Sequence, residues 1–343
     1  MDTTFDLIVV GTGSAGAGVA RRCRAAGWKV AVVDSRPYGG TCAQRGCDPK
    51  KVLVGAAEAV HAARRLVGKG VAADGLAIQW TDLIRFKRTF TEPVADRAEQ
   101  GLAKAGIETL HGRAQFVDRR SIRVGDQVVS ARYMHIATGA MPARLRLPGE
   151  DLLTSSDQFL ELDELPRRIV FLGSGFIAFE FAHVSAVAGA RVTMLEMLDR
   201  PLAGFDPDLV GVLVEGTRHM GIELHLQTKV ERVDRVADGL LVTAEGTRTF
   251  EADMVVHAAG RVPEIEDLDL DRGGVEWSRK GVRVNEHGRV PARAERRVHA
   301  AAAGVGRAPG VGGARTGPSL HQHLHAHRRL VLLAAARRAV VGA

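Results

Sequence analysis

Cysteine, aromatic residues and long apolar runs are scarce in this chain of 343 residues. Three cysteines are too few for a disulfide-stapled secreted scaffold, and aromatic residues make up only 5% of the chain. The first apolar run is confined to residues 7–10 and no basic segment precedes it, so we expect neither a signal peptide nor a membrane span. Hydrophobic residues nevertheless amount to 45%, which excludes a disordered chain and favours a globular protein. The length of 343 residues suggests about two domains, and the few cysteines together with the expected lack of a signal peptide favour a cytoplasmic location.

Basic residues are concentrated at the C-terminal end. Residues 289–343 hold ten Arg and one Glu, with no Lys or Asp, whereas the preceding 288 residues hold 37 basic and 39 acidic side chains. The net charge of +7 therefore belongs to the tail. Because the tail lacks aromatic residues and any recognisable binding module, we expect no nucleic-acid partner.

A strand–turn–helix–strand pattern opens the chain in FDLIVVGTGSAGAGVARRCRAAGWKVAVVD. Gly11 permits a tight turn, Gly13 lets the backbone approach a pyrophosphate, and Gly16 lets the helix pack close to the strand. Asp34 ends the second strand, where its carboxylate can accept hydrogen bonds from a ribose. The pattern predicts a dinucleotide-binding βαβ unit.

The same pattern recurs in RIVFLGSGFIAFEFAHVSAVAGARVTMLE. Gly173, Gly175 and Ala178 occupy the three small positions, and Glu196 is the strand-end acid. In both copies the acid follows the first glycine by 23 residues. One glycine-rich turn is a weak signal, but two copies with equal spacing predict two dinucleotide sites.

Each copy is followed later by a strand that ends at a glycine. HIATGAMP, with Gly139, follows the first copy, and VVHAAGRVP, with Gly260, follows the second. Two different dinucleotides, one a flavin and one a nicotinamide, would then face each other to move a hydride.

Two cysteines lie close together in GGTCAQRGCDPKK, and a helical run over residues 51–67 follows them. Cys42 and Cys47 can close a small disulfide, and helix-end amides with Lys50 or Lys51 would lower the pKa of a thiol. A metal site is disfavoured because no second Cys or His pair lies nearby. Cys23, on the first helix, is expected to be a packing residue.

These elements together resemble the flavin-dependent pyridine nucleotide–disulfide oxidoreductases of the glutathione reductase, dihydrolipoyl dehydrogenase and mercuric reductase group. GTGSAG, GGTCAQRGCDPKK, ATGAMP, LGSGFIAFE, MLE and HAAGRVP match in family order over residues 5 to about 288. Pro-Lys-Lys after the second cysteine looks more like glutathione reductase, and VTMLEMLDRPLAGFD more like dihydrolipoyl dehydrogenase.

The resemblance implies roles for named residues. FAD would be bound by Gly11, Gly13, Gly16, Asp34, Thr41 and Gly139. NAD(P)H would be bound by Gly173, Gly175, Glu196 and Gly260. Cys47 would be the flavin-proximal sulfur and Cys42 the thiol that attacks substrate. Lys50 or Lys51 would pair with Glu180 near the flavin.

The function implied is the passage of a hydride from NAD(P)H through FAD to the Cys42–Cys47 disulfide and on to a small disulfide substrate, as in glutathione reductase. Dihydrolipoyl dehydrogenase, mercuric reductase and a truncated flavoprotein without disulfide turnover are the alternatives. NADH is favoured over NADPH because the carboxylate of Glu196 would repel a 2′-phosphate, although glutathione reductases usually use NADPH.

The expected fold class is α/β with two Rossmann-like domains and no interface domain. The predicted segments are the FAD domain over 1–145, the NAD(P) domain over 146–270, an incomplete return to the FAD domain over 271–300, and an aberrant tail over 301–343.

The C-terminal part departs from the family pattern. Residues 298–301 resemble the start of a late strand, but Ala302 and Ala303 stand where the family has the Gly-Asp that binds the flavin. The family's interface domain, which forms the homodimer and supplies a His–Glu pair, is not recognisable. We hypothesise a frameshift near residues 286–300. For this chain we expect weak or absent FAD retention, no family-type dimer and negligible disulfide reductase turnover. Helix-end stabilisation of a Cys42 thiolate would recover part of the lost rate.

The alternating histidines of HQHLHAH could line a strand face, but we expect no metal site there.

Overall fold

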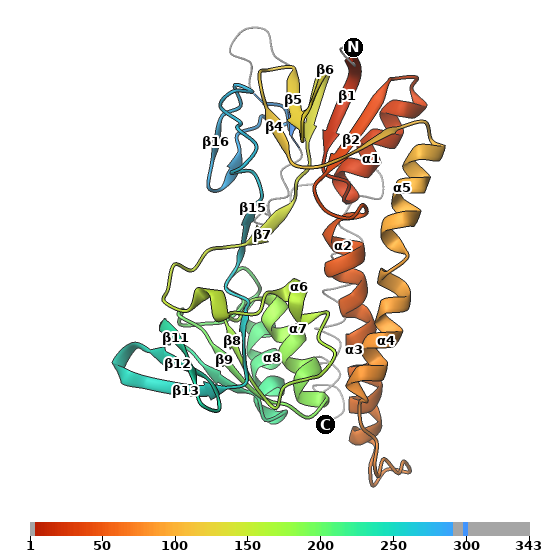
Figure 1. The fold of residues 1–343 in the computed structure, drawn as a ribbon. Coiled ribbons are helices and arrows are strands. Elements are labelled where there is room, and N and C mark those ends of the chain that lie inside the picture. The colour runs from red at the N-terminus through yellow and green to blue at the C-terminus, as the bar shows by residue number, and fades with distance from the viewer. Residues whose placement is uncertain (1–3, 291–297, 301–343) are drawn as a thin grey trace. The chain divides into compact units, whose positions relative to one another are not determined.

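The computed structural model describes residues 4–290 and 298–300, which form two compact units (Figure 1). Of the described residues, unit 1 holds 4–52, 85–143, 261–290 and 298–300, and unit 2 holds 53–84 and 144–260. The division falls within two helices, α3 (Cys47–Arg65) and α4 (Trp80–Thr91). Both units are α/β, as the fold class predicts.

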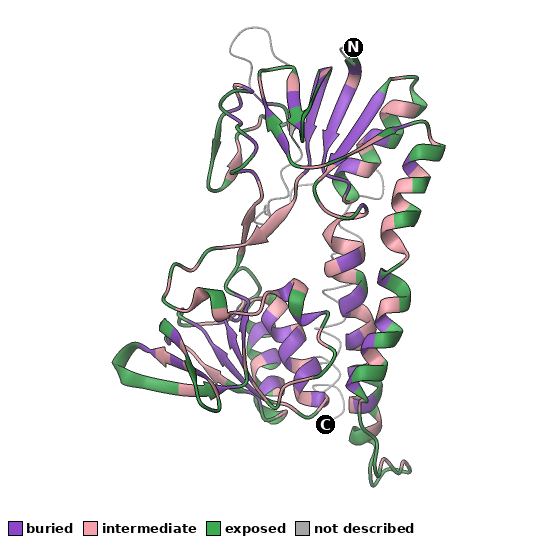
Figure 2. Ribbon diagram, in the orientation of Figure 1, coloured by how far each residue is buried: buried purple, intermediate pink, exposed green. Residues whose placement is uncertain are grey.

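Unit 1 is built on one sheet with the strand order β3-β2-β1-β6-β5-β4, and β18 also pairs with β6. The strands are β1 (Thr4–Val10), β2 (Val30–Asp34), β3 (Glu108–His111), β4 (Ala114–Phe116), β5 (Ser121–Val124), β6 (Gln127–Ile136) and β18 (Val298–Ala300). β3, β2, β1, β6 and β18 pair in parallel, whereas β5 pairs antiparallel with both β6 and β4. The late strand expected at residue 298 is therefore present. Strands buried on both faces, as β1 and β2 are in Figure 2, require continuous apolar runs.

The helices of unit 1 include the one that follows the first glycine turn and the two that carry Cys42 and Cys47. They are α1 (Ser14–Ala25), α2 (Gly40–Arg45), the first turn of α3, the last turns of α4, and α5 (Val94–Lys104). Two short ribbons complete the unit. They are β7 (Ala140–Pro142) with β15 (Arg261–Pro263), and β16 (Trp277–Ser278) with β17 (Gly281–Val282).

Unit 2 repeats the parallel arrangement with the strand order β10-β9-β8-β14. These strands are β8 (Arg168–Leu172), β9 (Arg191–Leu195), β10 (Glu223–His225) and β14 (Met254–His257). A separate antiparallel sheet contains β11 (Val230–Val236), β12 (Gly239–Ala244) and β13 (Arg248–Ala252). The helical segments are η1 (Glu150–Leu152), α6 (Ser156–Phe159), α7 (Phe176–Val187), α8 (Pro207–His219) and η2 (Glu245–Thr247), with the remainder of α3 and the start of α4.

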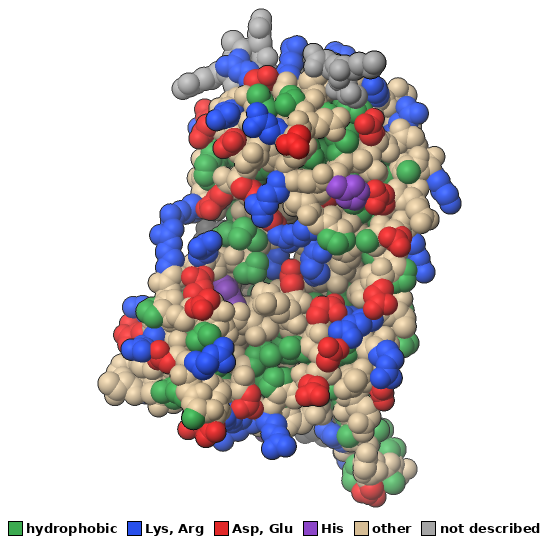
Figure 3. Space-filling view, viewed as in Figure 1, with side chains coloured by type: hydrophobic (Ala, Val, Ile, Leu, Met, Phe, Trp, Pro, Cys, Tyr) green, Lys and Arg blue, Asp and Glu red, His purple; other side chains and the backbone are tan. Residues whose placement is uncertain are grey.

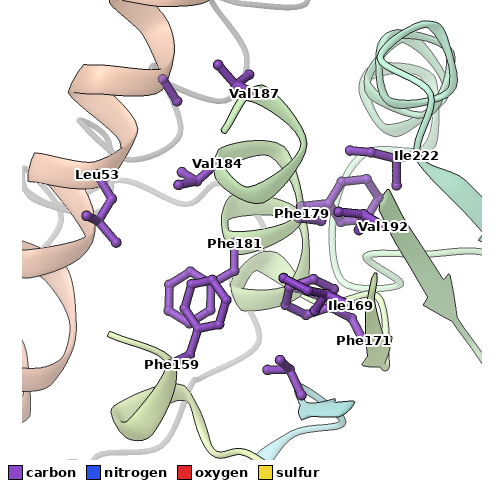
Figure 4. Close-up of a cluster of buried hydrophobic side chains, with 14 of the residues drawn as sticks. Leu53, Phe159, Ile169, Phe171, Phe179, Phe181, Val184, Val187, Val192 and Ile222 are labelled. Carbon is purple, nitrogen blue, oxygen red and sulfur yellow. The ribbon is translucent and has the colours of Figure 1, made fainter. Parts of the chain in front are cut away.

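The core of unit 2 is rich in phenylalanine around α7 (Figure 4). Phe159 and Phe181 stack with ring centroids 4.4 Å apart, and Phe171 and Phe179 are also fully buried. Aromatic side chains bury a large apolar area each, so this cluster is a main source of stability for the second dinucleotide fold. α7 is apolar on most of its surface because the core surrounds it.

His183 introduces a polar group into this region. Its Nε2 atom lies 2.8 Å from the hydroxyl of Thr217, and that hydroxyl donates to the carbonyl of Leu213, so Nε2 carries the proton and donates. Burial, and to a lesser degree the charge of His61, lower the pKa of His183 to about 4. The ring is therefore neutral at pH 7.

The surface carries charges of both signs. Figure 3 shows Lys and Arg side chains interspersed with Asp and Glu over the described residues of the face in view. None of the helices among residues 4–290 is long and apolar enough to cross a bilayer.

Candidate active site

The first glycine turn, between β1 and α1, tolerates no side chain at two of its glycines. Gly11 has φ +106°, and a Cβ atom there would lie 2.2 Å from the carbonyl oxygen of Ala137. A Cβ atom on Gly16 would lie 1.9 Å from the carbonyl oxygen of Gly11. The turn is thus closed against the end of β6, and the backbone N–H groups at the start of α1 remain available for an anion.

The carboxylate of Asp34 is held by the glycine turn. Its Oδ2 atom accepts hydrogen bonds from the backbone N–H of Thr12 at 2.9 Å and from the hydroxyl of Thr12 at 2.6 Å. Its Oδ1 atom accepts from the N–H of Arg36 at 3.0 Å. The predicted ribose acceptor is therefore fixed in position at the end of β2.

The second glycine turn has the same construction. Gly173 has φ +99°, and a Cβ atom there would lie 2.7 Å from the carbonyl oxygen of Ala258. Glu196 accepts from the N–H and hydroxyl of Ser174 at 2.9 and 2.6 Å, and from the N–H of Leu198 at 3.0 Å. The two copies agree in partners and distances, as well as in the spacing of the acids.

Thr12 and Ser174 are the residues that sequence reasoning missed. Each lies between the first two glycines of its turn, and each donates its hydroxyl proton to the strand-end acid. A hydroxyl side chain at this place in both copies was the available signal. The role of this hydroxyl depends on its contact with an acid 22 positions further along the chain, and the spacing alone does not reveal that contact.

The predicted redox cysteines lie on successive helices of unit 1. Cys42 is in α2, and Cys47 is the first residue of α3, which begins four residues earlier than the helical run predicted from Lys51. Gly46 separates the helices, and a Cβ atom there would lie 3.0 Å from the carbonyl oxygen of Thr41. This close turn brings the two thiols into hydrogen-bond contact, as free cysteines.

The two thiols differ in acidity. The pKa of Cys47 is lowered to about 6, first by the hydrogen bond that Cys42 donates and then by the charges of Lys50 and Lys51 against the opposing effect of burial and Asp48. The same hydrogen bond and burial raise the pKa of Cys42. Cys47 is therefore the more acidic thiol of the pair, and the expected helix-end stabilisation of a Cys42 thiolate stays a prediction.

The glycine turn of unit 1 packs directly on the start of α2. A Cβ atom on Gly40 would lie 2.3 Å from the Cα atom of Gly13. The backbone N–H of Gly39 donates to the hydroxyl of Thr12 at 3.1 Å. Thr41, a predicted FAD contact, is the residue between Gly40 and Cys42 on the same short helix. The predicted pyrophosphate turn and the predicted redox helix are therefore neighbours.

The two glycines that follow β6 and β14 have similar backbone conformations. Gly139 has φ +79° and follows β6, and Gly260 has φ +112° and follows β14. The residues after them form the β7–β15 ribbon, in which the guanidinium of Arg261 donates to the carbonyl of Ala140. The N–H of Glu264 donates to the carbonyl of Gly139 at 3.1 Å.

The remaining predicted residues are distributed over both units. Lys50 is buried and Lys51 half-buried on the first turn of α3 in unit 1, whereas Glu180 is half-buried on α7 in unit 2. The Lys–Glu pair stays a prediction. Gly175 begins α7 as its N-terminal cap, and Ala178 is fully buried where a third glycine would stand. Cys23 packs at the edge of a hydrophobic cluster of unit 1, and burial raises the pKa of its thiol.

Three predictions fall outside the described residues. They concern Ala302 and Ala303, the tail, and the histidines His321, His323, His325 and His327. Within the described residues, no group of three or more His, Cys, Asp or Glu side chains is arranged to hold a metal ion.

Comparison with known proteins agrees with this geometry. The family model described as pyridine nucleotide-disulphide oxidoreductase matches residues 5–309. The chain belongs to this family. It is 32% identical to a glutathione reductase of Nostoc sp. over 80% of this chain, and 34% identical to one of Burkholderia cepacia over 83%. It is 30% identical to a dihydrolipoyl dehydrogenase of Haloferax volcanii over 81%.

A solved structure is also similar. The HOCl-induced flavoprotein disulfide reductase RclA from Escherichia coli, as a Cu(II) complex, matches with a TM-score of 0.77 and 26% identity over 88% of this chain and 66% of that one. The present chain spans 61% of the length of the Nostoc and Haloferax relatives and 64% of the length of the Burkholderia one.

Proposed function

We propose that this chain binds FAD in unit 1 and a nicotinamide dinucleotide in unit 2, and that it reduces a small disulfide through Cys42 and Cys47. The observation that carries the proposal is the contact between an acidic thiol, Cys47, and Cys42, whose helix α2 starts against a glycine turn of the dinucleotide-binding type. A thiol of low pKa is a thiolate at neutral pH, and the thiolate is the form that takes part in disulfide exchange.

The residues of unit 1 fit a flavin dinucleotide. The turn at Gly11 and Gly13 offers backbone N–H groups to a pyrophosphate, and the fixed carboxylate of Asp34 offers oxygen acceptors to a ribose. Thr41 and Gly139 would line the same ligand. When bound, FAD together with the nicotinamide supplies the hydride transfer that leads to reduction of the cysteine disulfide.

The residues of unit 2 fit NADH better than NADPH. Glu196 presents a carboxylate where an adenosine ribose would lie, and a carboxylate accepts from a 2′-hydroxyl but repels a 2′-phosphate. Arg200, a nearby cation in the sequence, donates to the carbonyl oxygens of Ala203 and Phe205. Gly173, Gly175 and Gly260 would complete this site. The proposed cofactor preference differs from that expected for a glutathione reductase.

The thiol chemistry follows from the acidity of the pair. In the dithiol form, Cys42 holds a proton that it donates to the sulfur of Cys47. Cys42 can attack a substrate disulfide only after it loses this proton, and Cys47, with a pKa of about 6, is a weak acceptor for it. Exchange at Cys42 would form a mixed disulfide with one half of the substrate and release the other half as a thiol. Attack by Cys47 on the mixed disulfide would then restore the Cys42–Cys47 disulfide and release the second thiol.

Glutathione disulfide is the proposed substrate, because two of the relatives compared with this chain, at 32% and 34% identity, are glutathione reductases. Dihydrolipoamide chemistry is the second candidate, since a dihydrolipoyl dehydrogenase is also 30% identical. A reducing compartment such as the cytoplasm suits a thiol pair that must return to the dithiol form.

The test uses the full chain purified with added FAD. The expected result at saturating FAD is a yellow protein whose absorbance bleaches with NADH and whose turnover, slow because the family's C-terminal His–Glu pair is not recognisable, uses glutathione disulfide in preference to lipoamide. The Cys42→Ser variant is the matched control, which should bleach with NADH but reduce no disulfide. A wild-type protein that binds no flavin at saturation would overturn the proposal. Size-exclusion chromatography of the same sample tests the expected absence of a dimer.

A further inference from the structure

We propose that Thr12 is a positioning residue that joins the carboxylate of Asp34 to the start of the helix carrying Cys42. The inference rests on the proposed function, because it takes Asp34 as the acceptor for the adenosine ribose of FAD. It goes further by coupling that acceptor to the redox segment through one hydroxyl group.

The hydroxyl of Thr12 has a defined direction. An ionised carboxylate only accepts hydrogen bonds and a backbone N–H only donates them. The Thr12 proton therefore points to Asp34 at 2.6 Å, and a lone pair of the same oxygen accepts from Gly39 at 3.1 Å. Thr12 is 2% exposed, so water has little access to replace either bond.

Backbone packing makes this bridge stiff. Gly39 and Gly40 both have positive φ, +114° and +73°. Gly40 lies so close to Gly13 that a Cβ atom on it would be 2.3 Å from the Gly13 Cα atom. The start of α2 thus contacts the glycine turn through backbone at Gly40 and through the Thr12 hydroxyl at Gly39. A change at Thr12 would be transmitted to α2, and from α2 to the hydrogen bond that Cys42 donates.

The second copy of the motif provides an internal control. Ser174 donates to Glu196 at the same 2.6 Å, but it does so in unit 2, whereas both redox cysteines belong to unit 1. Loss of the Ser174 hydroxyl should therefore affect the nicotinamide site and leave the flavin site and cysteines unchanged.

The test compares the full chain with Thr12→Val, Thr12→Ser and Ser174→Ala. FAD and NADH affinities are measured by titration, and the pH midpoint of Cys47 alkylation is measured by iodoacetamide labelling and peptide mass spectrometry. A lost hydrogen bond to a charged group corresponds to about a 10-fold rise in Kd or more. We expect that rise for FAD in Thr12→Val, together with a rise of the Cys47 midpoint by about 0.5 pH units or more as the Cys42 bond loosens.

The other variants separate this role from general damage. Thr12→Ser keeps the hydroxyl and should stay within about twofold of wild type in FAD affinity, with an unchanged Cys47 midpoint. Ser174→Ala should raise the Kd for NADH about 10-fold and leave the other two measurements unchanged. If Thr12→Val does not fold, Asp34→Asn tests the bridge from its other end with the same two measurements.

The outcomes distinguish the two proposals. Wild-type protein that does not bind FAD overturns the proposed function and this inference with it. Wild-type protein that binds FAD while Thr12→Val keeps the wild-type FAD affinity overturns the inference alone. A weakened FAD affinity with an unchanged Cys47 midpoint, in Thr12→Val or in Asp34→Asn, also overturns it, because the coupling to α2 is then absent.

Discussion

The acidity of Cys47 gives the most direct test of the redox site, through replacement of its hydrogen-bond donor. The Cys42→Ala variant removes the largest of the effects that lower the pKa of Cys47 to about 6. Lys50 and Lys51 remain, so the pKa should rise toward, but not reach, the ordinary value of about 8.5 for a free cysteine. We expect a rise of about one to two pH units, because losing one charge-assisted hydrogen bond changes a pKa by that order.

The assay must measure a pH midpoint rather than a rate at one pH. At pH 7 a thiol with a pKa of about 6 is about 90% thiolate, and one with a pKa of about 8 is about 10% thiolate. The less acidic thiolate is also intrinsically more nucleophilic, by a Brønsted exponent of about 0.4–0.5, which offsets most of that difference in rate. Iodoacetamide labelling of Cys47 across pH 4–10, followed at its own peptide, separates the two effects.

A matched variant identifies the cause. Lys50→Met removes the first of the two lysine charges and should raise the midpoint of Cys47 less than Cys42→Ala does, since the hydrogen bond is the larger effect. A Cys47 midpoint that stays near pH 6 in Cys42→Ala would refute the reasoning. The lysines and the start of α3 would then be the source of the acidity.

Three further predictions concern turnover, cofactor choice and stability. Cys42→Ser and Cys47→Ser should each abolish disulfide reduction and leave bleaching of bound flavin by NADH largely intact; turnover at the normal rate in either variant would show that the cysteine assignment is wrong. NADH should be preferred over NADPH in steady-state kinetics, and Glu196→Gln should reduce that preference; a clear NADPH preference in wild type would contradict the charge argument. Burial lowers the pKa of His183 to about 4 in the folded protein, whereas an unperturbed histidine titrates near pH 6.5. Below pH 6.5 the unfolded chain therefore binds a proton that the folded chain does not, and about 3 kcal/mol of the unfolding free energy is lost as the pH falls from 6.5 to about 4. Urea unfolding at pH 7 and 4.5 should show less pH dependence in His183→Gln.

The local conformation of the glycine turns could be predicted from sequence. Gly11 and Gly173 have positive φ and lie against carbonyl groups, so the residue type and the backbone requirement coincide at single positions. The spacing to Asp34 and Glu196 is likewise set by the lengths of one helix and one strand. Features that depend on short segments of chain were therefore accessible without a structure.

Features that depend on tertiary packing were not. Residues 53–84 group with unit 2 because Leu53, Trp80 and Ile84 pack in the same core as Phe181, although they lie within the segment 1–145 predicted for the FAD domain. Their apolar spacing predicts a helix but does not say which sheet the helix covers. The unequal acidity of Cys42 and Cys47 depends on the hydrogen bond between the two thiols, which the sequence does not reveal. The start of α3 at Cys47 also lies four residues before the helical run predicted from Lys51.

The two copies of the motif differ in what the chain carries after the second strand. In unit 1 the segment after Asp34 returns to the glycine turn, where Gly39 donates to Thr12 and Gly40 packs on Gly13, and then continues into the helix of Cys42. In unit 2 the segment after Glu196 runs into a loop in which the N–H of Leu202 donates to the carbonyl of Ser174, and this segment contains no cysteine. The same acid clamp is thus used twice, and in both units the chain returns to its glycine turn after the second strand, but only in unit 1 does the returning segment lead into a helix that carries a cysteine.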